Sequence, residues 1–178
     1  TSCLVGSEMC IRDRNTGGMG AYSPSGLINA ELDKKIITEI VNPTFQAIKD
    51  MGENYKGFLY VGLMIKDNNP YLIEYNVRMG DPECQTILPL LATDLLDLIL
   101  SCCDETLESQ DILWEGKKSV CVVLCSNGYP GIYKKNVEIP NIENIKNNDS
   151  FFIYHAGTKK KDNKVYAKGG RVLNFGSI

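Results

Sequence analysis

The sequence has one histidine and one tryptophan among 178 residues, and its seven cysteines include no pair at the C-x-x-C spacing. A structural zinc site needs four cysteine or histidine ligands, commonly at such spacings, so none is expected here. Most of the cysteines lie within apolar runs. Because a free cysteine behaves as a small hydrophobe, we expect buried free thiols in a reducing cytoplasm.

The sequence also lacks an excess of basic charge and any long apolar stretch. Nineteen basic and 22 acidic side chains give a formal charge of −3, which argues against a nucleic-acid partner. Every apolar stretch is interrupted, for example at Gly62 or Asp94, well short of the roughly 20 residues of a membrane span. The first residues lack the basic start and apolar run of a secretory signal. A cytoplasmic globular protein is expected, and no obligate protein partner is evident.

Two helical pieces are predicted near the start of the readable pattern. Asn29 is a suitable N-cap for a helix whose apolar residues recur at helical spacing. Pro43 should kink or split this helix, because proline lacks the N–H that a helix interior needs. The second piece should end at Gly52, a common residue after a helix.

The stretch that follows predicts an antiparallel hairpin. Residues 57–66 are apolar on both faces, as in a central strand, and residues 71–76 alternate between apolar and polar. The four turn residues 67–70 join them. Asp81 then resembles an N-cap followed by proline at the first helical position. That helix is interrupted at Pro89 and should restart near Asp94, burying its apolar side chains. Those side chains are Leu95, Leu96, Ile99 and Leu100.

The remainder of the sequence predicts a second, mostly β region. Residues 105–117 are polar and acidic, which is typical of a linker. Strands are expected over residues 119–126, 151–156 and 171–175, with a turn at 128–131. The fold class is therefore α+β.

Glu74 and Asn76 are the most informative pair for chemistry. Residues two apart on a strand point to the same side and lie about 7 Å apart. A carboxylate and an amide oxygen are the hard ligands that Mg²⁺ prefers, together with phosphates and water. The alternative is an ordinary polar pair on the wet face of a half-exposed strand.

A charged turn and a glycine-rich loop add to this pair. Arg78, Gly80, Asp81, Pro82 and Glu83 place one cation and two acids in a turn after a strand, where phosphate or substrate could bind. The alternative is a strand-to-helix loop capped by Asp81. Upstream, the glycines of the loop Gly17-Gly18-Met19-Gly20 could let the backbone approach a phosphate, although such a loop is more often only a turn. His155 is more often structural in such a context than a general base.

Taken together, these stretches closely resemble the phosphoribosylamine–glycine ligase family of the ATP-grasp superfamily. In chain order the resemblance runs from residue 15 to 173 through Asn15–Pro24, Gly57–Ile65, Glu74–Glu83, Gly128–Gly131, His155–Thr158 and Gly169–Leu173. The Arg-x-Gly-Asp-Pro-Glu turn is the part most specific to the family. The resemblance implies the C-terminal part of an ATP-grasp domain, an antiparallel sheet with helices, followed by a small, mostly β C-terminal domain.

The reaction that the resemblance implies joins glycine to 5-phosphoribosylamine through a glycyl phosphate, with ATP as co-substrate, and forms glycinamide ribonucleotide, ADP and phosphate. It also implies that Glu74 and Asn76 bind Mg²⁺ or Mn²⁺, and that Arg78 and Asp81 help hold substrate or phosphate as catalytic residues. The substrate and phosphate loop would be Gly17 to Gly20, with Gly80, Pro82 and Glu83 in the turn. One alternative is another ATP-grasp carboxylate–amine ligase, against which the Arg78–Glu83 turn argues. The other is a non-catalytic nucleotide-binding module, which should bind Mg-ATP without hydrolysis in a calorimetric titration, whereas a broken fragment should bind feebly or not at all.

The resemblance also predicts how the chain divides. Residues 15–104 correspond to a partial ATP-grasp lobe, 105–117 to a linker, and 118–178 to a truncated C-terminal domain. Family members are more than twice as long, so the segment that covers the phosphates and adenine would precede residue 15. Residues 1–14 do not match the family and are interpreted as a leader of artefactual origin. We therefore expect this polypeptide alone to lack ligase activity.

Overall fold

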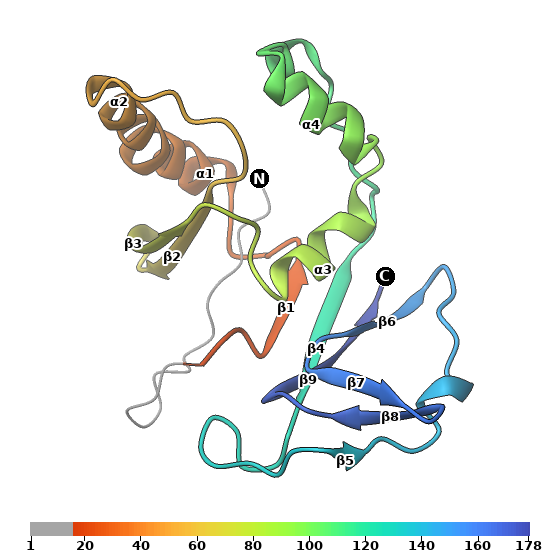
Figure 1. The fold of residues 1–178 in the computed structure, drawn as a ribbon. Helices are drawn as coiled ribbons and strands as arrows, with labels where there is room; N and C mark the ends of the chain where they lie inside the picture. The colour runs from red at the N-terminus through yellow and green to blue at the C-terminus, as the bar shows by residue number, and fades with distance from the viewer. Residues whose placement is uncertain (1–15) are drawn as a thin grey trace. The chain divides into compact units, whose positions relative to one another are not determined.

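The chain alternates between two folding units in the computed structural model, which describes residues 16–178 (Figure 1). The described part of the first unit is Pro24–Gly80 and Leu91–Gly116; that of the second is residues 16–23, Asp81–Leu90 and Lys117–Ile178. Helices and antiparallel strands together confirm the α+β class. The predicted domains, 15–104, 105–117 and 118–178, divide the chain differently from these two units. Those domain boundaries stay a prediction. The leader at 1–14 lies outside the described residues.

The first helix begins where its cap predicts. Helix α1 (Ala30–Ile36) follows Asn29, whose side-chain oxygen accepts a hydrogen bond from the N–H of Leu32 at 2.8 Å. This bond satisfies one of the backbone donors that the first turn of a helix leaves without an intrahelical acceptor.

Pro43 does not split the helix. A π-helical segment, Ile37–Val41, runs directly into α2 (Asn42–Asp50), so the proline falls in the first turn of α2. The N–H of Asn42 bonds the carbonyl of Ile37, five residues back. This wider turn accommodates a ring that would clash in a regular α-helix interior. After α2, Gly52 has a φ of +81°, as predicted for a helix stop.

The predicted hairpin is confirmed, with a shorter turn. Strand β2 (Tyr60–Lys66) pairs antiparallel with β3 (Asn69–Asn76). Only Asp67 and Asn68 form the turn, at φ values of 49° and 58°. Asparagine and aspartate tolerate such angles, which two-residue hairpin turns favour. Within the described part of the chain, β2 has β3 as its one partner, so the central-strand expectation does not hold there.

A bulge in β3 changes which side chains share a face. Gly62 pairs with Glu74 and the next residue, Leu63, pairs with Leu72, so Ile73 is the extra residue. The unbroken alternation expected over residues 71–76 is therefore wrong, because a bulge reverses the faces beyond it. Leu72 pairs instead with Leu63, which packs in the core of this unit with α1. The buried residues of that core are Leu32, Ile36 and Leu63.

Helix α4 (Leu95–Cys103) restarts the chain as predicted, because Asp94 caps it by accepting from the N–H of Leu96 at 2.7 Å. Its predicted burial is wrong. Leu96 is 61% exposed and Leu100 is 52% exposed, and Ile99 is exposed as well. Leu95 is only partly buried. An amphipathic helix buries its apolar side only where another element packs against that side.

The second unit is built on a four-stranded antiparallel sheet in the order β1-β4-β9-β6. Its strands are β1 (Gly20–Ser23), β4 (Ser119–Cys125), β6 (Phe151–His155) and β9 (Arg171–Ser177). The short helix α3 (Glu83–Ile87) contacts β1, β4 and β9. The core of this unit includes residues of β9, and Leu173 is fully buried in it. The remaining buried members of that core are Ile142, Ile153, Ala167 and Val172.

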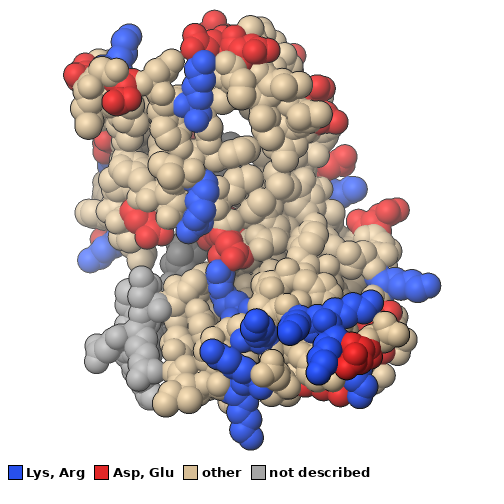
Figure 2. Space-filling view, viewed as in Figure 1, with Lys and Arg blue, Asp and Glu red and all other residues tan. Residues whose placement is uncertain are grey.

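A second sheet, in the order β5-β8-β7, carries four lysines on two of its strands. Its strands are β5 (Val137–Glu138), β7 (Thr158–Lys161) and β8 (Lys164–Ala167). The edge strand β7 exposes three consecutive lysines, 159 to 161, and Figure 2 shows basic side chains gathered over this region. Charged side chains on an edge strand oppose pairing with another chain, which accounts for them structurally.

The expectation of buried thiols holds for one described cysteine. Cys121 is 1% exposed, whereas Cys103 is exposed and the other described cysteines are partly buried. Burial, with smaller contributions from the carboxylates of Asp81 and Glu83, raises the pKa of the Cys121 thiol to about 11. Among residues 16–178, no helix has the length and hydropathy to cross a membrane.

The core of the second unit gives a stability prediction. We expect Leu173→Ala to lower the free energy of unfolding by about 2–5 kcal/mol, because a fully buried leucine leaves a cavity when truncated. The matched control is Leu124→Ala, since Leu124 lies on β4 and is 46% exposed; it should cost less than about 1 kcal/mol. Urea unfolding followed by circular dichroism measures both, and equal losses would contradict this core assignment.

Candidate functional site

Glu74 and Asn76 lie side by side on β3. The Asn76 Nδ2 donates a hydrogen bond to Glu74 Oε1 at 3.0 Å, so the predicted sharing of one face is confirmed. Gly62 pairs with Glu74 across the hairpin, and a Cβ at Gly62 would lie 3.0 Å from Glu74 Cγ. The absence of a side chain at Gly62 therefore gives the Glu74 side chain its space.

The chemistry of this pair suits a hard cation. Glu74 is exposed and Asn76 is partly buried. The bond between them uses the amide nitrogen of Asn76, which leaves its oxygen as a potential ligand beside a carboxylate. Mg²⁺ takes such oxygen ligands and completes its shell with phosphate and water. In the part of the chain that the structure describes, no group of three His, Cys, Asp or Glu side chains could hold a metal ion. The metal role of Glu74 and Asn76 stays a prediction.

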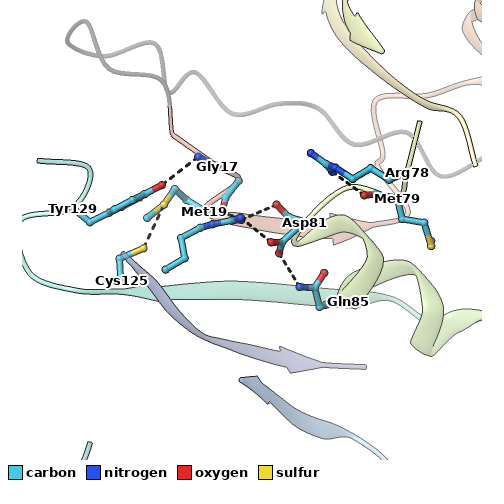
Figure 3. A network of polar contacts seen from close by, with 10 residues as sticks. Gly17, Met19, Arg78, Met79, Asp81, Gln85, Cys125 and Tyr129 are labelled. Carbon is cyan, nitrogen blue, oxygen red and sulfur yellow. Dashed lines mark hydrogen bonds and ion pairs between the residues drawn. The ribbon is translucent and has the colours of Figure 1, made fainter. Parts of the chain in front are cut away.

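The carboxylate of Asp81 does not cap α3, contrary to the sequence pattern. Helix α3 begins after Pro82 without a side-chain cap. Instead, Asp81 Oδ2 forms an ion pair with Arg171 Nη2 at 2.7 Å, and Asp81 Oδ1 accepts from Gln85 Nε2 at 2.8 Å. Figure 3 shows the bond between Asp81 and Gln85. A guanidinium adds the attraction of a full positive charge to its hydrogen bond, which a backbone N–H at a helix cap does not, and this explains the preference.

The glycine-rich loop is bound by residues far along the chain. The N–H of Gly17 donates to the hydroxyl of Tyr129 at 3.3 Å, and the carbonyl of Gly18 accepts from Arg171 Nη1 at 3.2 Å. The carbonyl of Met19 accepts from the N–H of Val123 at 3.0 Å. These contacts lead the loop into β1, whose first residue is Gly20 (Figure 3).

Two of the loop glycines make room for these neighbours. A Cβ on Gly17 would lie 2.7 Å from Arg171 Cζ, and a Cβ on Gly18 would lie 2.5 Å from Pro82 Cδ and 2.8 Å from the Asp81 carbonyl oxygen. Real side-chain atoms do not approach so closely. Glycine is thus needed here for contact with Arg171 and with the Asp81–Pro82 turn. A phosphate contact by Gly17, Gly18, Met19 or Gly20 stays a prediction.

The other predicted turn residues fall in both units. Arg78 is exposed, and its Nη1 donates to the carbonyl of Met79 at 2.9 Å; Arg78 and Gly80 belong to the first unit. Pro82 and Glu83 belong to the second, where Pro82 is almost fully buried. Among the predicted residues, the structure joins the glycine loop to the Asp81–Pro82 turn, and it separately joins Glu74 to Asn76.

Arg171 and Tyr129 are the site residues that sequence reasoning missed. Both were noted only as parts of family-like stretches. One signal was present: the chain has four arginines and 15 lysines, and Arg171 is the charged residue that follows two glycines and opens an apolar strand. Arginine in such a place is typical of a planar, multiply bonded contact. His155 is exposed, and its Nδ1 lies 3.0 Å from Thr158 Oγ1, which agrees with a structural role.

An antiparallel hairpin with an acid and an amide on one face, and a glycine loop tied to an Asp-Pro turn, place the chain in the ATP-grasp class. Two family models match it: residues 11–84 match "Phosphoribosylglycinamide synthetase, ATP-grasp (A) domain" and residues 119–178 match "Phosphoribosylglycinamide synthetase, C domain". The chain therefore belongs to the phosphoribosylglycinamide synthetase family.

Two curated relatives illustrate the similarity. A phosphoribosylamine–glycine ligase of Caldanaerobacter subterraneus is 47% identical over 165 residues, which is 90% of this chain and 38% of that protein. The chicken trifunctional purine biosynthetic protein adenosine-3 is 43% identical over 92% of this chain and 16% of its own length. The chain thus spans well under half the length of these relatives.

Solved structures agree on the fold. The crystal structure of phosphoribosylamine–glycine ligase from Thermotoga maritima matches with a TM-score of 0.75 and 36% identity, over 93% of this chain and 40% of that one. The biotin carboxylase domain of the Hydrogenobacter thermophilus 2-oxoglutarate carboxylase, a complex with MgADP, ADP and bicarbonate, matches with a TM-score of 0.59 and 15% identity, over 93% of this chain and 35% of that one. The second likeness concerns the fold alone.

The close approach at Gly18 gives a second prediction. We expect Gly18→Ala to destabilise the protein by about 1–3 kcal/mol, because its Cβ would overlap the Asp81–Pro82 turn. Gly26→Ala is the matched control, since a Cβ at Gly26 meets nothing within 4 Å. Thermal unfolding of both variants measures the difference. Equal melting temperatures would contradict the packing of the loop on the turn.

Proposed function

We propose that this chain is the C-terminal part of an ATP-dependent ligase that joins glycine to 5-phosphoribosylamine in cytoplasmic purine synthesis. The observation that carries the proposal is the pairing of Glu74 with Asn76 at 3.0 Å on one face of the hairpin. The two matching family models and the relatives support the choice of reaction.

Glu74 and Asn76 would hold Mg²⁺ or Mn²⁺ through the carboxylate and the amide oxygen. When bound, such a cation neutralises charge on the phosphate oxygens of ATP. The hydrogen bond from Asn76 to Glu74 orients both side chains before ligands arrive, which limits the entropy lost on binding. Gly62 leaves space beside Glu74, so the carboxylate can adjust its position.

The reaction proceeds in two balanced steps. A carboxylate oxygen of glycine attacks the γ-phosphorus of ATP, the bond to the β-phosphate oxygen breaks, and glycyl phosphate and ADP form. The amine nitrogen of 5-phosphoribosylamine then attacks the acyl carbon, phosphate leaves, and the nitrogen loses a proton. Positioning and electrostatic stabilisation supply most of the catalysis in such transfers.

The charged turn and the glycine loop would position the substrates. Arg78 is exposed and carries a charge suited to a phosphate or carboxylate. Both carboxylate oxygens of Asp81 already bond to side chains of this chain, so its contribution would be to fix the shape of the turn. The backbone N–H groups of Gly18 and Met19 would be further donors for anionic substrate groups.

The activity prediction uses a hybrid polypeptide in which the upstream part of the Caldanaerobacter ligase precedes this chain. We expect the chain alone to release no ADP above background, because it spans 38% of the length of the Caldanaerobacter ligase and positioning of the reactants supplies much of the catalysis. We expect the hybrid to release ADP only when glycine, 5-phosphoribosylamine and Mg-ATP are all present. A coupled assay for ADP measures both.

Two outcomes would contradict this assignment. Turnover by the chain alone would show that the site is complete without the upstream part. Binding of Mg-ATP by the hybrid without turnover, measured by calorimetry, would favour a non-catalytic nucleotide-binding module.

The metal prediction concerns the same hybrid. Glu74→Gln and Asn76→Ala should each weaken Mn²⁺ binding in the presence of ADP by about tenfold or more, because each removes one of two side-chain ligands. Glu39→Gln is the control, since Glu39 is an exposed glutamate in the π-helical segment. Electron paramagnetic resonance titration measures free Mn²⁺. Unchanged affinity in both site variants would exclude this pair as the metal site.

A further inference from the structure

The guanidinium of Arg171 joins two segments that are distant in the sequence. Its Nη1 donates to the carbonyl of Gly18 at 3.2 Å and to the carbonyl of Asp81 at 2.9 Å, and its Nη2 donates to Asp81 Oδ2 at 2.7 Å. The side chain of Arg171 is 24% exposed. The three bonds tie the glycine loop to the Asp81–Pro82 turn.

The backbone at Arg171 is hydrogen-bonded to segments on both of its sides. Arg171 pairs with Cys125 on β4, and its carbonyl accepts from the N–H of Gly157 at 3.0 Å. Ser126 binds the two glycines before Arg171. Its N–H donates to the carbonyl of Gly170 and its hydroxyl donates to the carbonyl of Gly169, both at 2.8 Å. The backbone that carries the guanidinium is therefore fixed in advance.

The residues around the guanidinium leave space for it. Gly17 has no side chain where Arg171 lies, and Gly18 has none where Pro82 lies. Tyr129 binds the N–H of Gly17, and its ring occupies the space that a Cβ on Gly170 would need. A lysine at 171 would offer one compact charge in place of a planar fork with donors on two nitrogens.

We propose that Arg171 is a positioning residue that fixes the glycine loop and the Asp81–Pro82 turn for substrate binding. Arg171 and Tyr129 lie in the segment that matches the C-domain model, whereas the loop and the turn lie in the segment that matches the ATP-grasp model. The C domain thus supplies the residues that shape the substrate loop of the ATP-grasp domain. The kinetic part of this inference rests on the proposed ligase function.

The first test measures the positioning itself, without activity. Amide hydrogen exchange of the chain, followed by mass spectrometry, should rise by about tenfold or more over residues 17–20 and 81–85 in Arg171→Met, because three anchoring bonds are lost. Exchange in the hairpin β2–β3 should stay unchanged. Lys168→Met is the control, since Lys168 is an exposed cation close in sequence to Arg171. Unchanged exchange in both segments would overturn the proposal.

The second test uses the hybrid ligase. Arg171→Ala should lower kcat/KM for glycine by about 100-fold, with the KM for ATP changed less than about twofold. Guanidinium chloride at low millimolar concentration should restore part of the lost activity, whereas sodium chloride should not, because the ion can occupy the space of the missing side chain. The hybrid with Arg171→Lys should be less active than the hybrid with Arg171→Ala in the presence of guanidinium.

The two tests separate the proposal from the proposed function. An unsubstituted hybrid without ligase activity would contradict the function, while the exchange measurement still decides whether Arg171 holds the loop and turn. A fully active Arg171→Ala hybrid would overturn the positioning role even if the ligase function holds. An equal loss of kcat/KM for glycine and for ATP, without rescue by guanidinium, would indicate general destabilisation. That result would also overturn the positioning role.

Discussion

Three oxygen atoms accept hydrogen bonds from the planar guanidinium of Arg171, and these bonds determine how the second unit is arranged around them. The Gly18 carbonyl, the Asp81 carbonyl and the Asp81 carboxylate come from two segments of the chain, and each loses water when it binds the guanidinium. Buried or partly buried charged groups are stable only when paired and hydrogen-bonded. The ion pair at 2.7 Å therefore fixes where the glycine loop and the turn can lie.

This constraint explains several residues that would otherwise look unrelated. Gly17 and Gly18 are small because the guanidinium and Pro82 fill the space where side chains would lie. Asp81 bonds Gln85 and Arg171 and does not cap α3, because a carboxylate gains more from a cation than from a backbone N–H. The two ends of the segment that matches the ATP-grasp model, residues 16–23 and 81–84, thus belong to the same compact unit as the segment that matches the C-domain model.

The hairpin of the first unit follows a simpler constraint. Its period-two alternation puts Glu74 and Asn76 on one face, and the bulge at Ile73 leaves that pair intact because both residues follow it in the strand. The glycine opposite Glu74 provides room for the side chain. By contrast, α4 exposes most of its apolar side chains within the described residues. Amphipathic pattern alone does not decide what a helix packs against.

The sequence by itself determined the features that depend on near neighbours. The caps at Asn29 and Asp94, the stop at Gly52, the hairpin and the shared face of Glu74 and Asn76 all rest on residues within a few positions of one another. Local sterics and strand or helix period are sufficient for these. The family resemblance likewise rests on short motifs read in order, and the matching family models agree with it.

Only the tertiary structure decided the partner of Asp81, the role of Arg171 and the reason for the loop glycines. Arg171 is separated from Asp81 by 90 positions and from Gly18 by 153. No local propensity specifies a contact at such a separation, because many chain paths have the same local pattern. The bulge at Ile73 belongs to the same group, because it adjusts the strand to neighbours that are set by the folded chain.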